Sequence, residues 1–252
     1  MNVRVIVAGA TGWAGSALSR GILATPDLHL VGAVSRSAAG KPLGKCVVSA
    51  TCAEALKTQA DVFFEYTRPQ LAKANVAAAL EAGLHVVVGT SGLTDEDYAE
   101  LALIAKDKQR GLLAVGNFAI TVVLLHKFAE MAAKFIPHFE VIDSAKESKP
   151  DAPSGTAREL AWRLGNVRKP ELSIPPNEAR GMTLNGVQVH SVRVPGFVIG
   201  LEAVFGMKDQ RLHLRHEAGS SAEPYVDGAL LAIRKVGTLT GLHRGLDKVI
   251  DW

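Results

Sequence analysis

The sequence predicts an α/β fold, in which a doubly wound, mostly parallel sheet is followed by a second, α+β domain with a mixed sheet. Strand-like apolar runs alternate with helix-like runs up to residue 118, as in a sheet that helices cover on both faces. After residue 118, three strand-like runs, 187–194, 198–205 and 210–216, follow one another without helices between them. Clustered strands are typical of an antiparallel or mixed sheet, so we expect a separate domain there.

Composition and charge narrow the class of protein. The chain has 252 residues, 48% hydrophobic and 21% charged, which fits a globular protein of one large or two modest domains. Its net charge of +3 comes from Lys and Arg scattered among Asp and Glu, which disfavours nucleic acid as a partner. The sequence contains neither a transmembrane-length apolar run nor a signal peptide, so we expect no membrane partner and a cytoplasmic location. Cys46 and Cys52 lack metal-ligand spacing, and we expect reduced thiols and no metal site.

A glycine-rich turn separates the first apolar run, Val3 to Ala8, from a helix-like run over 16–23. Gly9 permits a tight turn, Gly12 lets a pyrophosphate approach the backbone, and Gly15 lets the helix pack close to the strand. Strand, glycine turn and helix in this order are typical of a Rossmann dinucleotide site. The spacing GxxGxxG alone also suits a tight turn without a ligand. We expect a bound dinucleotide.

The residues after the second strand-like run, 28–34, bear on which dinucleotide binds. A protein that prefers NAD usually has Asp or Glu there, which binds the ribose hydroxyls. This chain has Ser35 and Arg36, with Lys41 close behind, and a guanidinium suits the 2′-phosphate of NADP. We therefore expect NADPH, with NADH as the alternative cofactor. The competing interpretation is that Arg36 is a solvated surface charge.

Three further turns end strand-like runs of the first domain, at 65–67, 89–92 and 116–118. In doubly wound sheets, ligands bind outside the carboxyl ends of the strands. We therefore expect these turns to line one crevice together with the glycine turn.

The second domain holds a stiff loop between a strand-like run, 139–145, and a helix-like run, 156–164. Pro150 and Pro153 rigidify this loop, and Ser154 suits the N-cap of the following helix. The free N–H groups of a helix start attract anions, and Gly155 has no side chain to cover them. We expect an anion site here, whereas the alternative is a capped helix without a ligand.

The domain boundaries follow from these patterns. The dinucleotide-binding domain is expected over 1–118. The C-terminal segment 224–252 is expected to pack against this domain, and its helix-like pattern runs from 224 to 242. The substrate-binding and oligomerisation domain is expected over 119–223. Its sheet is large for its few helices, so we expect the open face to be buried against a second subunit.

Together these motifs resemble the dihydrodipicolinate reductase (4-hydroxy-tetrahydrodipicolinate reductase) family. The most specific motif is Asp-Ala-Pro-Ser-Gly-Thr-Ala at 151–157, preceded by Lys149. The supporting motifs span nearly the whole chain in the family's order: the glycine turn at 9–15, Glu65-Tyr-Thr-Arg-Pro69, Gly89-Thr-Ser-Gly92, Asn117-Phe118, His190-Ser-Val-Arg-Val-Pro-Gly196, Arg215-His216 and Leu230-Leu-Ala-Ile-Arg-Lys235.

The resemblance implies hydride transfer from NADPH to a cyclic unsaturated imine-type dicarboxylate, the step from 4-hydroxy-tetrahydrodipicolinate to tetrahydrodipicolinate in lysine and diaminopimelate biosynthesis. It also implies a homotetramer formed through the second domain's sheet. Lys149 is the implied proton donor, and Ser154, Gly155 and Thr156 are the implied contacts of a substrate carboxylate. The implied cofactor-binding residues are Gly9, Thr11, Gly12, Trp13, Gly15, Arg36, Tyr66, Thr67, Gly89, Thr90, Gly116, Asn117 and Phe118.

One departure from the family pattern affects the chemistry. The family has a His-His pair just before the lysine, whereas this chain has Ala145 and Lys146, and no histidine occurs from 139 to 189. Alanine cannot transfer a proton, while Lys146 could replace the second histidine as a substrate contact. Three functions stay open: the family's reaction with a variant site, a paralogous reductase of a different carboxylated imine or activated alkene, and a non-catalytic NADPH-binding protein.

Overall fold

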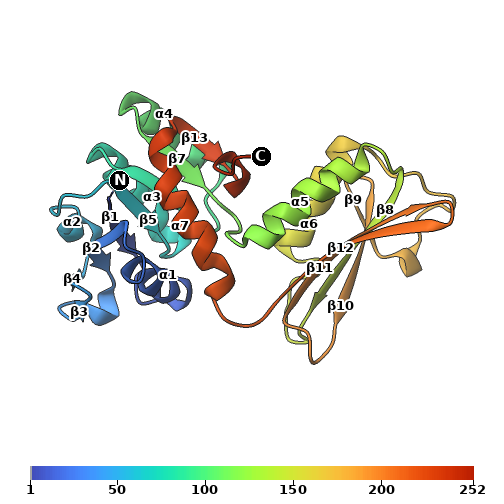
Figure 1. Cartoon of the computed structure of the whole chain (residues 1–252), viewed down its shortest axis with the longest axis horizontal. Helices are drawn as coiled ribbons and strands as arrows, with labels where there is room; N and C mark the ends of the chain where they lie inside the picture. Colours follow the sequence, from blue (N-terminus) through green and yellow to red (C-terminus); the bar gives the residue numbers. More distant parts are fainter. Residues whose placement is uncertain (1) are drawn as a thin grey trace. The chain divides into compact units, whose positions relative to one another are not determined.

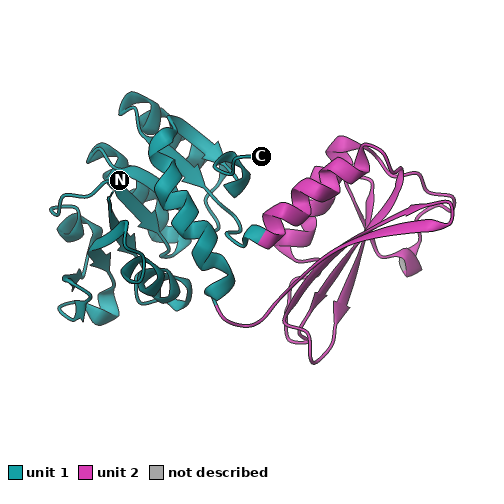
Figure 2. Ribbon diagram, viewed as in Figure 1, with its two compact units in different colours: residues 1–120, 222–252 teal, residues 121–221 magenta. Residues whose placement is uncertain are grey.

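The chain, described over residues 2–252 by a computed structural model, divides into two units. Unit 1 contains the residues up to Ile120 together with 222–252, and unit 2 contains 121–221 (Figure 2). The sequence places these boundaries after residues 118 and 223. Unit 2 is therefore an uninterrupted segment, whereas unit 1 is assembled from both ends of the chain.

Unit 1 is built on an eight-stranded sheet in the order β13-β7-β6-β5-β1-β2-β4-β3 (Figure 1). Every neighbouring pair is parallel except β3 and β4, which confirms the predicted mostly parallel, Rossmann-like sheet. Its strands are β1 (Val3–Ala8), β2 (Leu28–Val34), β3 (Pro42–Leu43), β4 (Cys46–Ser49), β5 (Val62–Glu65), β6 (His85–Val88), β7 (Gly111–Ala114) and β13 (Gly241–Arg244).

Helices pack on both faces of this sheet. One layer holds α1 (Trp13–Leu23) and α7 (Val226–Lys235), which contact each other. The other holds α2 (Cys52–Ala55), α3 (Pro69–Glu81) and α4 (Asp95–Asp107), in which α3 contacts both of its neighbours. The layers explain the nearly continuous apolar strands at the centre of the sheet, because helices there cover both faces.

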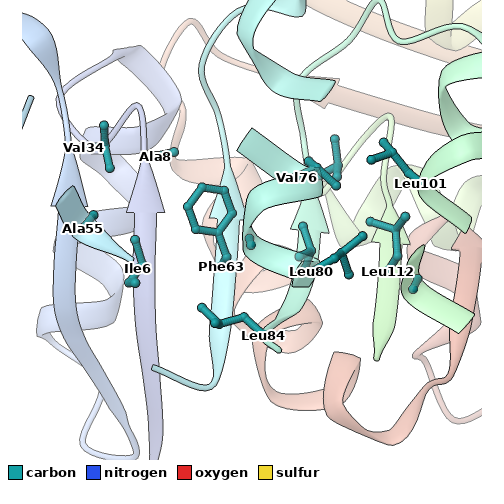
Figure 3. Close-up of a cluster of buried hydrophobic side chains, with 14 residues drawn as sticks. Ile6, Ala8, Val34, Ala55, Phe63, Val76, Leu80, Leu84, Leu101 and Leu112 are labelled. Carbon is teal, nitrogen blue, oxygen red and sulfur yellow. The ribbon is translucent and has the colours of Figure 1, made fainter. Parts of the chain in front are cut away.

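A hydrophobic core fills the space between the sheet and the α2–α4 layer (Figure 3). Ile6, Ala8 and Phe63 come from the strands and are fully buried. Val76 and Leu80 of α3 pack against them, since positions four apart lie on one face of a helix. Strand Cβ atoms alternate, so the neighbours of these strand residues face the α1–α7 layer.

The helix predicted over 224–242 is shorter in the structure. It ends at Lys235, a short turn of helix follows over Val236–Thr238, and Gly241–Arg244 forms β13, which pairs in parallel with β7. Gly241 has φ +76°, a left-handed conformation that interrupts a helix. The strand was missed because four residues carry little periodicity and the partner lies far away in sequence.

Unit 2 has a five-stranded sheet in the order β12-β11-β8-β10-β9. β8 and β10 are parallel while the other pairs are antiparallel, which confirms the predicted mixed sheet. The strands are β8 (His138–Ala145), β9 (Met182–Leu184), β10 (Val187–Arg193), β11 (Ile199–Met207) and β12 (Gln210–Ala218). The helices are α5 (Ile120–Ala133) and α6 (Gly155–Val167), and both lie on one face of the sheet (Figure 1).

The two faces of this sheet differ in chemistry. Phe139 and Val141 of β8 point to the helices and join a buried core. Glu140, between them, points to the other face and bonds His190 of β10 at 2.6 Å. On that same face Glu202 of β11 bonds His213 of β12, also at 2.6 Å. The alternation also places the carboxyl group of Asp143 on the helix-facing side, where charged groups are rare.

Candidate active site

The three glycines of the first turn have different roles in unit 1. A Cβ on Gly9, whose φ is +80°, would lie 2.3 Å from the Tyr66 carbonyl oxygen, and one on Gly15 would lie 2.0 Å from the Gly9 oxygen. Both positions are therefore required by packing. Gly12 is the N-cap of α1 and provides no side-chain hydrogen bond to the helix start. The first N–H groups of α1 thus have no capping side chain, as pyrophosphate binding requires.

Hydroxyl groups gather beside this turn at the end of β2. Thr11 Oγ1 lies 2.6 Å from Ser35 Oγ, and Ser35 Oγ lies 3.3 Å from Ser37 Oγ. Arg36, between the two serines, is exposed. The structure thus places Thr11 and Arg36 at one end of the predicted dinucleotide site. Ser37 joins this group but was not singled out from the sequence, because serine is common in turns.

The turns after β5, β6 and β7 meet around the side chain of Tyr66. Its ring lies edge-on to Phe118, with centroids 5.7 Å apart. A Cβ on Gly89 would lie 2.1 Å from the Tyr66 ring, so only glycine fits there. By contrast, a Cβ on Gly116 would meet no atom within 4 Å. Gly116 is therefore not required by packing, and its place at a strand end suits close approach of a ligand.

Glu65, at the end of β5, is fully buried and organises two of these turns. Its Oε1 accepts hydrogen bonds from the Thr67 N–H at 2.6 Å, from the Thr67 hydroxyl and from the Thr90 hydroxyl at 3.3 Å. Its Oε2 accepts one from Asn75 Nδ2 at 3.0 Å. Burial raises the pKa of Glu65, and the bonds from Thr67, Asn75 and Thr90 offset part of this effect. Glu65 thus links two predicted cofactor-binding residues, Thr67 and Thr90.

The raised pKa of Glu65 makes the stability of the fold depend on pH. A carboxyl group whose pKa is raised on folding stabilises the fold fully below its ordinary pKa of 4.5 and loses that contribution as pH rises through the raised value. Glu65→Gln removes this titration. We expect the unfolding free energy of the unmodified protein to fall relative to the variant as pH rises above 4.5. Urea denaturation over the acidic to neutral range measures this difference, with exposed Glu96→Gln as the control. A pH-independent difference would contradict the prediction.

In unit 2 the predicted proton donor lies on the turn after β8. The Lys149 N–H donates to the Lys146 carbonyl at 3.1 Å, which closes the turn. Lys149 Nζ lies 2.6 Å from Asp151 Oδ1, and its side chain is about one-third exposed. The hydrogen bond from Lys149 lowers the pKa of Asp151. The pair fixes the ammonium group while leaving part of it accessible, and Lys146 is exposed nearby.

The helix start after this loop has the expected cap. Ser154 Oγ accepts from the Ala157 N–H, so α6 begins at Gly155 as the sequence predicts. The Ser154 hydroxyl in turn donates to Asp143 Oδ1 at 2.7 Å. A Cβ on Gly155 would meet no atom within 4 Å. The N–H groups of Gly155 and Thr156 precede the first intrahelical bond, so the predicted anion site remains open to a ligand.

Three residues around the loop were not predicted from the sequence. Asp143 is 2% exposed and bonds Ser154, while Arg193 and Arg158 bond backbone oxygens of residues 151–153. Asp143 had a detectable signal, since an acidic residue at a core-facing strand position is unusual. Arg193 lies within the motif at 190–196, but nothing in the sequence links either arginine to this loop, because backbone carbonyls occur at every residue.

Residues 2–252 contain no group of three or more His, Cys, Asp or Glu side chains that could hold a metal ion. Over the same residues, every helix is too short or too polar to cross a membrane.

The fold and the two sets of residues define a class of protein. A Rossmann-type unit with a glycine turn, joined to a unit with a lysine on the loop before a capped helix start, fits an NAD(P)H-dependent reductase. The comparisons with known proteins identify its family. Residues 3–118 match the model "Dihydrodipicolinate reductase, N-terminus", and residues 121–250 match "Dihydrodipicolinate reductase, C-terminus". The chain belongs to the dihydrodipicolinate reductase family.

Individual relatives agree over the full length. A 4-hydroxy-tetrahydrodipicolinate reductase of Desulfitobacterium hafniense is 37% identical, with 99% of each chain covered. That of Moorella thermoacetica is 36% identical, covering 100% of this chain and 99% of the relative. Among solved structures, dipicolinate-bound dihydrodipicolinate reductase from Paenisporosarcina sp. TG-14 is similar, with a TM-score of 0.91, 28% identity and coverage of 99% and 100%.

Proposed function

We propose that this chain catalyses the NADPH-dependent reduction of 4-hydroxy-tetrahydrodipicolinate to tetrahydrodipicolinate, a step of lysine and diaminopimelate biosynthesis. The observation that carries the proposal is the substrate loop, in which Lys149 lies on a stiff turn just before the open helix start at Gly155. Membership of the family supports it, and so do the names of relatives that match over the full length.

Each end of the substrate has a proposed contact in unit 2. The substrate is a dicarboxylate, and Ser154, Gly155 and Thr156 form the helix start that holds one of its carboxylates. Lys146 is an exposed cation on the adjoining turn and is proposed to contact substrate in place of the family's second histidine. Lys149 donates the proton that reduction of a conjugated bond requires. The dipicolinate-bound relative supports a dicarboxylate substrate, because dipicolinate is itself a planar dicarboxylate.

The residues of unit 1 suit a dinucleotide. NADPH, when bound, supplies the hydride. Gly12 and the start of α1 would hold the pyrophosphate, and Arg36 with the Thr11 and Ser35 hydroxyls would hold the 2′-phosphate. The other proposed contacts are Gly9, Trp13, Gly15, Tyr66, Thr67, Gly89, Thr90, Gly116, Asn117 and Phe118.

Arg36→Ala tests the cofactor preference. A hydrogen bond to a charged group contributes about 1.5–3 kcal/mol, so the Kd for NADPH is expected to rise about 10- to 150-fold. The Kd for NADH, which has no 2′-phosphate, is expected to stay unchanged. Titration of each dinucleotide by nicotinamide fluorescence measures both values, with exposed Lys106→Ala as the matched control. Tighter binding of NADH than of NADPH by the unmodified protein would contradict the preference.

The replacement of the family's histidine pair by Ala145 and Lys146 favours one alternative, a paralogous reductase of a different carboxylated imine or activated alkene. An activity assay distinguishes the proposed reaction from that of a paralogous reductase. Purified protein is supplied with NADPH and the freshly made product of dihydrodipicolinate synthase, and the loss of nicotinamide absorbance is followed. Turnover supports the proposed reaction. A rate at background beside intact NADPH binding would exclude it and leave the paralogue and the non-catalytic NADPH-binding protein.

The assembly and location are also proposals. We propose a homotetramer in which the face of the unit 2 sheet that carries Glu140 and Glu202 is buried between subunits, because both helices of the unit lie on its other face. Light scattering of the purified protein tests this oligomeric state.

We place the enzyme in the cytoplasm, which fits the free thiols of Cys46 and Cys52.

A further inference from the structure

Two arginines bind the backbone of the loop that precedes α6. Arg193 Nη2 donates to the Asp151 carbonyl oxygen at 2.7 Å. Arg158 donates from Nε to the Pro153 oxygen at 3.0 Å and from Nη2 to the Ala152 oxygen at 3.4 Å. Three successive carbonyl oxygens are thus bound by guanidinium groups. Because these oxygens are already hydrogen-bonded, fewer free backbone oxygens remain in the loop to repel an anionic ligand.

A buried carboxylate holds the end of the same loop. Asp143 Oδ2 accepts from the Ser154 N–H at 2.8 Å and from Arg193 Nη2 at 2.7 Å, while Oδ1 accepts from the Ser154 hydroxyl at 2.7 Å. Asp143 is 2% exposed, and a buried charge is costly unless it is paired. Arg193 supplies the pairing and, through the same nitrogen, reaches Asp151. We call Asp143 and Arg193 the loop clamp.

The clamp limits which groups can bind a substrate carboxylate. Ser154 has one N–H and one O–H, and both donate to Asp143. Within residues 2–252, no hydrogen bond engages the N–H groups of Gly155 and Thr156 or the Thr156 hydroxyl. These three donors remain for a ligand.

We propose that Asp143 and Arg193 are positioning residues of the substrate site: they hold Ser154 and Asp151, so that Gly155 and Thr156 bind the carboxylate while Ser154 makes no direct bond to it. This inference rests on the proposed function and refines it, since Ser154 then shapes the site rather than contacting substrate. A clamp of one buried anion and one partly buried cation also adds no net charge beside a dicarboxylate.

Asp143→Asn tests the clamp with little change in shape. The amide keeps one acceptor but can no longer accept from the Ser154 N–H, the Ser154 hydroxyl and Arg193 together. We expect the KM for the substrate to rise on the order of tenfold or more, with a Kd for NADPH within about twofold of the unmodified value. An unchanged KM in the folded variant would overturn the clamp.

Two further variants separate positioning from general stability. Glu130→Gln breaks another partly buried ion pair of unit 2, with Arg163 at 3.0 Å, and lies outside the loop. It is expected to lower the thermal midpoint as Asp143→Asn does and to leave KM within about twofold. A tenfold rise in KM here would show that any damaged ion pair has this effect.

Arg193→Lys keeps the charge but lacks the guanidinium fork, so KM should rise even if Asp143→Asn does not fold. An unchanged KM would overturn the proposal.

The role of Ser154 is tested by a double-mutant cycle. Because its hydroxyl acts through Asp143, Ser154→Ala is expected to add less than about twofold to KM when introduced beside Asp143→Asn. Effects that multiply independently would mean that Ser154 bonds the substrate directly, and would overturn that part of the proposal.

Dipicolinate binding distinguishes failure of the clamp from failure of the proposed reaction. If the unmodified protein does not reduce 4-hydroxy-tetrahydrodipicolinate, the proposed function fails, and calorimetric titration with dipicolinate still reports on the carboxylate site. Asp143→Asn and Arg193→Lys should weaken dipicolinate binding on the order of tenfold, and Glu130→Gln should not. Equal affinities in all four proteins would overturn the clamp whatever the reaction is.

Discussion

Replacing Lys149 by alanine is expected to lower kcat by about 10²- to 10⁴-fold, the usual contribution of a positioned general acid. The Kd for NADPH should not change, because every proposed cofactor contact lies in unit 1 and Lys149 in unit 2. The structure gives the reason for the large effect. The ammonium group is fixed 2.6 Å from Asp151 on a turn stiffened by two prolines, and alanine leaves no proton donor at that position.

Lys149→Arg separates proton donation from charge. A guanidinium keeps the positive charge but does not release its proton in proteins, so KM should stay near the unmodified value while kcat stays low. Pre-steady-state measurement of nicotinamide oxidation gives the rate of the reductive step in each variant. Exposed Lys208→Ala, also in unit 2, is the control and should leave kcat unchanged. Full activity of Lys149→Ala would end the assignment of Lys149 as the proton donor.

The second large effect is expected at Gly155, where alanine should raise the KM for the substrate about tenfold or more without destabilising the fold. A Cβ there meets no protein atom, so the only group it obstructs is a ligand on the N–H groups of Gly155 and Thr156. Hydrogen bonds to a carboxylate contribute about 1.5–3 kcal/mol each, and partial loss of one accounts for a tenfold change. Alanine is also the better helix former, so the thermal midpoint should stay equal or rise.

Gly9→Ala provides the opposite case. Its Cβ would lie 2.3 Å from a carbonyl oxygen, and its φ is positive, so this variant should lose stability. Thermal denaturation should therefore show a lower midpoint for Gly9→Ala and an equal or higher midpoint for Gly155→Ala, whereas substrate kinetics should show the raised KM of Gly155→Ala. A Gly155→Ala enzyme with unchanged KM would mean that the carboxylate binds elsewhere.

Local chemistry was predictable from the sequence where neighbours in the chain determine it. Ser154 as a cap needs only the residues beside it, and the start of α6 at Gly155 agrees with the structure. The glycine turn was predictable for the same reason, and for both features the structural cause lies within a few residues. The clustering of strands along the chain indicated the mixed second sheet, although its pairings join distant segments.

Features that depend on distant partners were not predictable in this way. Arg193 and Asp151 are far apart in sequence, and their contact exists only because β10 pairs in parallel with β8. Strand β13 needs β7 as a template, so its four residues were assigned to a helix. The burial of Glu65 depends on Asn75 and Thr90 from two other elements. Contacts between distant segments, rather than local secondary-structure propensity, determine all three of these features.

The pairing of β13 with β7 also constrains the order in which the protein can fold during synthesis. Residues 121–221 are synthesised before Gly241–Arg244, so all of unit 2 has been made before β13 can pair with β7. Until then β7 has an unpaired edge, and unpaired edges are prone to wrong associations in a nascent chain. The dinucleotide unit, which begins the chain, is therefore the last part to be completed.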